Sequence, residues 1–282
     1  MNEEPERRLP MLPTMTIGDL TVSRLIVGSN PFTGKSHRNA AVDADMKAHF
    51  TEEQAFAMLR RCEEVGINAV QSRGSMPVMG LLHRYRQQGG NLLWLAQTGK
   101  SLASFEEELD EMMKYSPAAV CIHGELSDEL YLCGMLDRLG TLLDQIRAKG
   151  VPCGICSHFP EVLTYAEEHR LKPDYYMASV YNLFQPDRSH DVDPTGERFE
   201  DSDVPVMYRV IRSLSAPTVA LKILGAGRKC ETQEQVRSCF VRAFSEMKPG
   251  DGVLVGMFDK YDDQPYLNAR YTEEAIRLAG GI

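Results

Sequence analysis

The chain has 282 residues, of which 43% are hydrophobic and 25% charged, the ordinary balance of a globular protein with a sizeable core. A net charge of -9 and a pI near 5.4 argue against a nucleic-acid-binding surface, which would need a basic face. No apolar run approaches the roughly 20 residues of a membrane span, and the N-terminus lacks the apolar segment of a secretory signal. The seven cysteines lie mostly in apolar runs, as reduced thiols do. We therefore expect a cytoplasmic protein that binds a small molecule but neither nucleic acid nor membrane.

Apolar runs of strand length alternate with amphipathic stretches of helix length along the chain. A flexible tail over residues 1–15 precedes the first strand at 20–28, and a polar, irregular connection follows at 38–50. Further strands are predicted at 67–71, 92–96, 118–122, 152–156, 175–180, 217–224 and 253–255. Helices are predicted at 51–65, 78–88, 104–115, 136–149, 161–169, 205–214 and 233–247.

This alternation amounts to eight strand-then-helix units, which implies a parallel sheet. Eight units in about 250 residues is the count of a closed (β/α)₈ TIM barrel. An open doubly wound sheet would need a glycine-rich fingerprint directly after its first strand, and Gly28-Ser-Asn-Pro31 does not supply one. The sequence therefore predicts an α/β fold with a single barrel domain over residues 16–282.

Active sites of such barrels lie at the C-terminal ends of the strands, so the polar residues that follow each strand are the candidates. His123 and His158 end neighbouring strands and could act as general acid and base. They could equally bind a divalent metal, with His37 or Glu125 as a further ligand. The residues that we expect to bind substrate are Asn30, Gln71, Arg73, Glu125 and Tyr181.

The stretch from Pro217 to Arg228 is an apolar strand interrupted by one lysine and followed by a glycine-rich turn. Lys222 could form a Schiff base or stabilise an oxyanion, and burial among apolar neighbours would lower its pKa. The turn also suggests a phosphate site with the backbone of the neighbouring strand end. The residues predicted to bind a phosphate of substrate or cofactor are Gly225, Gly227, Arg228, Gly256 and Lys260.

Residues 185–203 form a long polar segment with seven acidic residues. We expect it to cover a site or to pack between subunits of a homo-oligomer.

Several short motifs, in matching order and spacing, resemble the aldo-keto reductase superfamily. They are the first strand at 20–28, Gly66-Ile-Asn68, Gly154-Ile-Cys-Ser-His-Phe159, Val180-Tyr-Asn-Leu183, Gln235-Val236, and Val253-Leu-Val-Gly-Met257 with Asn268. The resemblance covers most of the chain and implies a (β/α)₈ barrel with NADP as the cofactor. It also adds Asn268 to the predicted phosphate- or cofactor-binding residues.

The superfamily's catalytic Asp, Tyr, Lys and His are only partly present. Gln71 takes the place of the Asp, the following loop Ser72-Arg-Gly-Ser75 has no Tyr, and Gln97 or Thr98 stands where the Lys belongs. His123 alone matches. Without the Tyr–Lys pair, no evident acid protonates a carbonyl oxygen during hydride transfer.

The leading hypothesis is therefore an enzyme that acts without redox chemistry on a small polar carbonyl or sugar-type substrate. This substrate could carry a phosphate group. Isomerisation, elimination or aldol cleavage would begin by proton abstraction next to the carbonyl, with His123, His158 and Lys222 as the catalytic residues. Two alternatives stay open. One is a divergent NADP-dependent reductase, and the other is a non-catalytic ligand-binding barrel.

Overall fold

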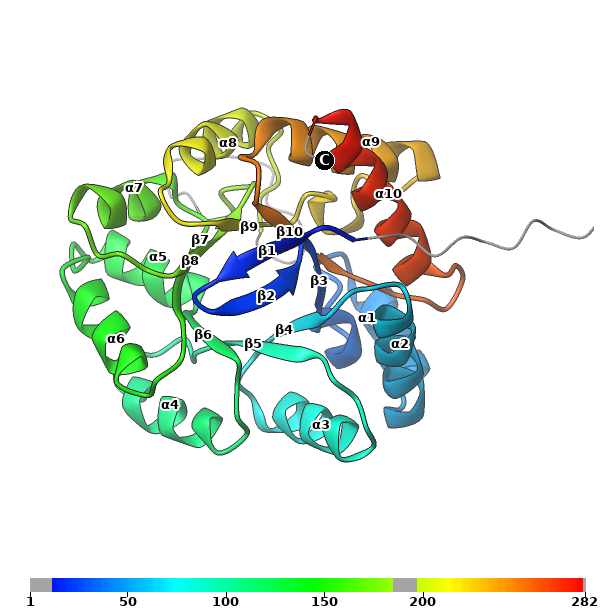
Figure 1. The fold of residues 1–282 in the computed structure, drawn as a ribbon, viewed down its shortest axis with the longest axis horizontal. Coiled ribbons are helices and arrows are strands. Elements are labelled where there is room, and N and C mark those ends of the chain that lie inside the picture. The colour runs from blue at the N-terminus through cyan, green and yellow to red at the C-terminus, as the bar shows by residue number, and fades with distance from the viewer. Residues whose placement is uncertain (1–11, 185–196, 281–282) are drawn as a thin grey trace, which may run out of the picture.

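The computed structural model describes residues 12–184 and 197–280. Eight parallel strands form a closed barrel in the order β10-β3-β4-β5-β6-β7-β8-β9, with helices around the outside (Figure 1). The barrel strands are β3 Leu25–Gly28, β4 Ala69–Arg73, β5 Leu93–Gln97, β6 Ala119–Ile122, β7 Cys153–Ser157, β8 Tyr175–Ser179, β9 Thr218–Leu221 and β10 Gly252–Gly256. The predicted TIM barrel is confirmed.

The helices follow the strands as the alternation predicts, and three of the ten have no counterpart among the predicted ranges. They are α1 Ala40–His49, α2 Glu52–Glu64, α3 Met76–Gln87, α4 Phe105–Met113, α5 Gly124–Leu132, α6 Arg138–Arg147, α7 Pro160–Glu168, α8 Asp203–Ser213, α9 Gln233–Glu246 and α10 Gln264–Leu278. Short 3₁₀ turns η1 Asn30–Thr33 and η2 Gly225–Gly227 follow β3 and β9.

Helix α1 lies where the sequence predicted an irregular connection, which was wrong. It begins at Asn39, whose side chain accepts a hydrogen bond from the backbone N–H of Val42, and none of its residues is buried. Because it has no buried face, it lacks the hydrophobic period by which helices are recognised. Helices α5 and α10 were also not predicted.

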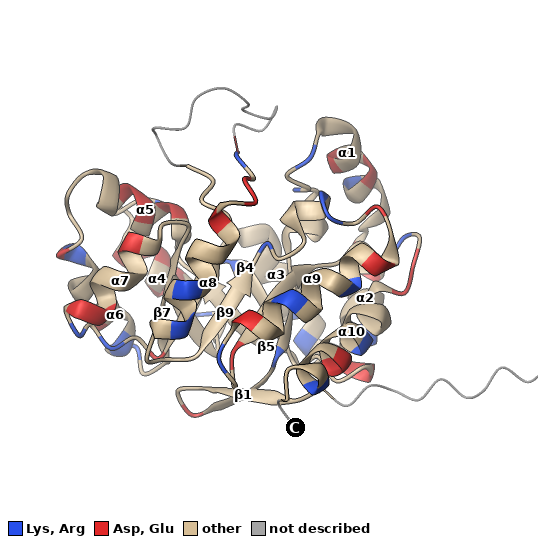
Figure 2. Ribbon diagram, turned by 90° about the horizontal axis from the view of Figure 1, so that it is seen from above, with Lys and Arg blue, Asp and Glu red and all other residues tan. Residues whose placement is uncertain are grey.

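The predicted first strand at 20–28 is two strands. β1 Thr14–Ile17 and β2 Leu20–Ser23 form an antiparallel hairpin, and the barrel strand β3 begins only at Leu25. The hairpin lies across the N-terminal end of the barrel, facing the viewer in Figure 1 and at the bottom in Figure 2. Of the tail predicted over 1–15, residues 1–11 lie outside the described residues, whereas Thr14 and Met15 already belong to the hairpin.

Two apolar clusters reflect the two faces of the parallel sheet. The larger lies between the strands and the helices, and the smaller fills the barrel interior. Met15, Ile17 and Val22 of the hairpin close that interior from below. The opposite end, where the barrel strands have their C-terminal residues, lies at the top in Figure 2. Within residues 12–184 and 197–280, no helix is both long and apolar enough for a membrane span.

Candidate active site at the barrel mouth

Alternation along the strands determines which side chains reach the barrel mouth. Ala69, Cys121 and Cys156 point into the barrel and belong to the interior cluster. Since side chains two residues apart share a face of a strand, Gln71, His123 and His158 follow on the same inner side. Neighbouring strands β4 to β8 are in parallel register, so these side chains converge at one end of the barrel.

His158 is held by a buried carboxylate that the sequence analysis did not identify. The Nδ1–H of His158 donates to Oδ2 of Asp128 at 2.6 Å, and the ring packs edge-on against Phe184. The other oxygen of Asp128 accepts from the hydroxyl of Ser157 at 2.6 Å and from the backbone N–H of His158 at 3.1 Å. Asp128 is 3% exposed and His158 8%. A carboxylate only accepts, so Nδ1 carries a proton, and in the neutral ring Nε2 holds the lone pair.

His123 has the opposite arrangement. It precedes α5, and its Nδ1 accepts a hydrogen bond from the backbone N–H of Glu125 at 3.1 Å. Burial holds the pKa of His123 well below its usual value, and the charges of Lys100, His158 and Arg73 lower it further, against the opposing effect of Glu125. The ring is therefore neutral, with its proton on Nε2. A neutral imidazole at a helix N-terminus can donate a hydrogen bond to a carbonyl oxygen.

The two histidines are close neighbours. His158 contributes to the lowered pKa of His123. A Cβ placed on Gly124 would lie 3.2 Å from Cε1 of His158 and 3.1 Å from Sγ of Cys156. The mouth therefore brings a hydrogen-bond acceptor and a hydrogen-bond donor together on adjacent strands.

Lys222 directly follows β9 with a left-handed backbone, at φ 60°. Such a conformation in a residue other than glycine is strained, and strained residues concentrate at functional sites. Its side chain is half-buried, with Nζ 5.6 Å from the centre of the Phe199 ring. Desolvation lowers the pKa of Lys222 to about 8, although Glu197 and Glu125 act in the opposite direction. The charge of Lys222 also acts to lower the pKa of Cys156, which is two residues before His158 on the inner face of β7.

Both ring nitrogens of His37 already have hydrogen-bond partners within the protein. Its Nδ1 donates to Glu197 at 2.7 Å, and its Nε2 accepts from the side chain of Asn30 at 2.9 Å. Burial lowers its pKa, and Lys222 adds to the shift despite the opposing hydrogen bond to Glu197. Among the residues that the structure describes, no three His, Cys, Asp or Glu side chains form a group that could hold a metal ion. The metal site predicted from His37, His123 and His158 stays a prediction, to be tested by metal analysis of the purified protein.

The residues predicted to bind phosphate are dispersed. Lys260 forms an ion pair with Asp45 of α1 and is exposed, and Asn268 is 5% exposed within α10. Arg228 donates to the backbone carbonyl of His37 at 3.0 Å and stacks on Phe199 at 3.8 Å. The structure therefore does not bring these three side chains together.

The glycine backbone predicted for the phosphate lies at two neighbouring strand ends. Gly225 and Gly227 belong to η2 and both have positive φ, which glycine adopts readily. The N–H of Gly225 donates to the carbonyl of Lys222 at 2.8 Å, so this donor is already used. Gly256 ends β10 and would meet Pro31 at 3.2 Å if it carried a Cβ.

The remaining predicted substrate-binding residues differ in position. Gln71 is 7% exposed, and its Nε2 is buried without a partner among the described residues. Glu125 forms an ion pair with Lys100. Tyr181 packs in the outer cluster and donates its hydroxyl to Asp201 at 3.2 Å, and a Cβ on Gly225 would lie 3.6 Å from that hydroxyl. Of the acidic segment, residues 185–196 lie outside the described residues, while Glu197 contacts His37.

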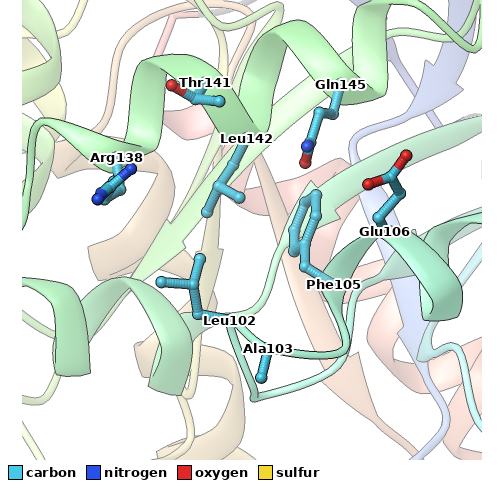
Figure 3. A pocket seen from close by; sticks show the side chains of 8 residues that line it. All are labelled: Leu102, Ala103, Phe105, Glu106, Arg138, Thr141, Leu142 and Gln145. Carbon is cyan, nitrogen blue, oxygen red and sulfur yellow. The ribbon is translucent and has the colours of Figure 1, made fainter.

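A cavity of about 330 Å³ lies elsewhere, between α4 and α6 on the outside of the barrel (Figure 3). It is lined by Leu102, Ala103, Phe105, Glu106, Arg138, Thr141, Leu142 and Gln145. None of these belongs to the strand ends, so the cavity is separate from the mouth.

No protein-family model matches the chain, and no curated protein matches its sequence. Solved structures do match. An aldo-keto reductase from Bacillus halodurans is 12% identical, with 95% of this chain and 96% of that one covered and a TM-score of 0.59. A truncated 3-deoxy-D-arabino-heptulosonate 7-phosphate synthase from Thermotoga maritima is 11% identical, with coverage of 95% and 91% and a TM-score of 0.53.

An N-acetylmannosamine-6-phosphate 2-epimerase from Clostridium perfringens is also similar. It is 12% identical, with 89% of this chain and 92% of that one covered and a TM-score of 0.51. At such identities the similarity establishes the fold, and the three proteins carry different activities on it. This chain has the TIM-barrel fold, and its membership of the aldo-keto reductase superfamily stays a prediction.

Proposed function

We propose that this protein is an enzyme that removes a proton next to the carbonyl of a small polar or sugar-type substrate, in a reaction of the isomerase, lyase or aldolase type. The observation that carries the proposal is the pairing of His158, oriented by Asp128, with the neutral His123 on the adjacent strand. One ring offers a hydrogen-bond acceptor to the substrate, and the other offers a hydrogen-bond donor.

In the proposed step, Nε2 of His158 takes the proton from the carbon. The electron pair of the broken C–H bond moves into the carbonyl, and an oxyanion develops on its oxygen. The Nε2–H of His123 donates to that oxygen, and the ammonium group of Lys222 stabilises the negative charge. Asp128 stabilises the imidazolium that forms on His158.

A reductase mechanism with His123 as the acid is less well supported. The lowered pKa of His123 leaves little imidazolium near neutral pH to protonate an alkoxide. The NADP-dependent alternative is tested by titrating the protein with NADPH and following fluorescence, where micromolar binding would favour it.

The proposal is tested by hydrogen exchange into D₂O, followed by NMR, with hydroxyacetone and dihydroxyacetone as probes. The wild-type protein should exchange the hydrogens next to the carbonyl. His158→Ala and His123→Ala should each lose about 10²-fold or more, because each removes one partner of the proton transfer.

The matched control is His169→Ala, since His169 ends α7 and is exposed at the opposite end of the barrel. Circular dichroism checks that each variant is folded. Full exchange by both mouth variants would refute the proposed function.

A further inference from the structure

Arg73 is a cation at the barrel mouth that has no ion-pair partner among the described residues. It is the last residue of β4 and lies on the same face as Ala69 and Gln71, which points it toward the barrel axis. Its backbone is fixed in register with Gln97 of β5, and the next N–H, of Gly74, donates to Gln97 at 2.8 Å. The guanidinium forms no ion pair or hydrogen bond with any residue of the described chain. A rigid strand therefore presents an unpaired guanidinium at the mouth.

Lys35 is a second such cation, presented by the loop after η1. Its backbone N–H donates to the carbonyl of Asn30 at 2.9 Å, and the next residue, Ser36, is bonded through its N–H to Asp43 at 2.8 Å. These bonds fix the loop while the Lys35 side chain stays exposed. No carboxylate within residues 12–184 and 197–280 pairs with its ammonium group.

The strands β3, which Lys35 follows, and β4, which Arg73 ends, are neighbours in the barrel, and both charges act on groups of the mouth. The charge of Arg73 lowers the pKa of His123, and the charge of Lys35 lowers the pKa values of Glu125 and Glu197. Two other cations near the mouth are engaged by protein groups. Lys100 pairs with Glu125, and Arg228 is held by the carbonyl of His37. Arg73 and Lys35 thus leave the mouth with positive charge that the described carboxylates do not neutralise.

A buried, unpaired donor lies beneath Arg73. Gln71 is two residues earlier on the same face of β4, and its Nε2 has no hydrogen-bond partner among the described residues. A buried amide donor without a partner costs about 1–3 kcal/mol, so such groups usually serve a ligand or a water molecule. Gln71 therefore points independently to a ligand with hydrogen-bond acceptors at this position.

We propose that Arg73 and Lys35 bind an anionic group of the substrate, a phosphate or a carboxylate, with Gln71 donating to an adjacent oxygen of the same molecule. Guanidinium matches either anion with two parallel N–H donors, and Lys35 adds a second charge. The assignment of this ligand as substrate rests on the proposed function. It places the anion site on the β3 and β4 side of the mouth, away from the glycine-rich turn after β9.

The first experiment measures anion binding to the full chain by isothermal titration calorimetry at low ionic strength, with inorganic phosphate and acetate as separate probes. We expect saturable binding of at least one probe, weakened about tenfold or more in Arg73→Gln and in Lys35→Gln. The controls are Arg277→Gln, in the last turn of α10, and Lys172→Gln, between α7 and β8; both are exposed cations that precede a strand or end a helix, and both variants should bind as the wild type does. Binding of neither probe, or unchanged binding in both mouth variants, would overturn the inference.

The second experiment decides which anion is the substrate group. In the D₂O exchange assay, pyruvate is compared with hydroxyacetone, and dihydroxyacetone phosphate with dihydroxyacetone. If only one charged probe exchanges faster than its neutral partner, that probe carries the anionic group that the site binds. The advantage of the charged probe should disappear in Arg73→Gln. Equal exchange of charged and neutral partners would contradict an anionic substrate.

The two proposals fail in different ways. If His158→Ala binds phosphate or acetate as tightly as the wild type but no protein exchanges any ketone, the anion site stands and the proposed proton abstraction falls. If neutral ketones exchange and neither anion binds, the proposed proton abstraction stands and the anion site falls.

Discussion

At the residue scale, two identical imidazoles are given different roles by the partners of their Nδ1 atoms. His158 donates from Nδ1 to a buried carboxylate, whereas His123 accepts at Nδ1 from a backbone N–H. The first arrangement leaves a lone pair on Nε2 and the second leaves a proton there. The environment of each ring therefore decides which one is the base and which one the donor.

Asp128→Asn tests how His158 is oriented. The amide can donate to Nδ1 and so favour the wrong tautomer of the ring, which removes the lone pair from Nε2. We expect the rate of hydrogen exchange from the ketone probe to fall by about 10²–10⁴-fold with the circular dichroism spectrum unchanged. An exchange rate within twofold of the wild type would show that Asp128 has only a structural role.

From the pKa of Lys222 we expect the rate of hydrogen exchange to fall at alkaline pH. Its pKa is lowered to about 8, so the ammonium group is present below that pH and lost above it. Since the charged form stabilises the oxyanion, the exchange rate should fall about tenfold for each pH unit above 8. Lys222→Arg stays charged and should lose this alkaline decline. A decline that persists unchanged in Lys222→Arg would assign it to another group.

At the element scale, α5 orients the two histidines that we propose as the catalytic pair. Its N-terminal cap is His123, its first residue is Gly124, and one turn later Asp128 reaches across to His158 on the next strand. A single helix of nine residues therefore orients both rings.

Gly124→Ala tests this arrangement. The added Cβ would lie 3.1–3.2 Å from Cys156 and His158, so the His158 ring must shift by a few tenths of an ångström. Because small displacements of a reacting group are costly, we expect the exchange rate to fall by about tenfold or more, with the same fold. Gly140→Ala on α6 is the matched control, because its Cβ would meet only Leu171 at an ordinary 3.7 Å. Equal rates in both variants would contradict the role of α5 in placing His158.

At the scale of the whole molecule, the barrel is closed at one end and polar at the other. The β1–β2 hairpin inserts Met15, Ile17 and Val22 into the interior cluster from below. Burial of this apolar surface stabilises the barrel, and it leaves the C-terminal strand ends as the entrance for a polar ligand.

Ile17→Ala should lower the free energy of unfolding by about 2–5 kcal/mol, because Ile17 is fully buried and its removal leaves a cavity. Thr16→Ala, on the exposed face of the same strand, should change it by less than about 0.5 kcal/mol. Urea denaturation measures both. A loss below 1 kcal/mol for Ile17→Ala would mean that the hairpin is not part of the cooperative core.

The barrel itself could be predicted from the sequence because parallel strands buried on both faces must be apolar throughout. Runs such as Ala118–Ile122 and Pro152–Cys156 therefore mark strands without any alignment. The position of catalytic groups followed from the same logic. A polar residue directly after a buried strand, such as His123 or His158, must lie at the C-terminal edge.

Two of the three unpredicted helices were outside the reach of this reasoning. α1 buries no residue and carries no hydrophobic period, and only His123 separates α5 from the end of β6. Because α5 was not predicted, Asp128 was not identified as the partner of His158. The signal that could have revealed it is the run Gly124-Glu-Leu-Ser-Asp128, in which a helix directly after His123 brings the carboxylate back toward the barrel.

The sequence by itself determined the fold class and the approximate positions of the barrel strands. Only the tertiary structure decided the partners: Asp128 for His158, Glu197 for His37 and Asp45 for Lys260. The physical reason is that periodicity specifies the face on which a side chain lies, whereas hydrogen bonds and ion pairs depend on ångström distances between segments far apart in the chain. The unpaired cations Arg73 and Lys35 became evident as a candidate anion site only once the described carboxylates had been assigned elsewhere.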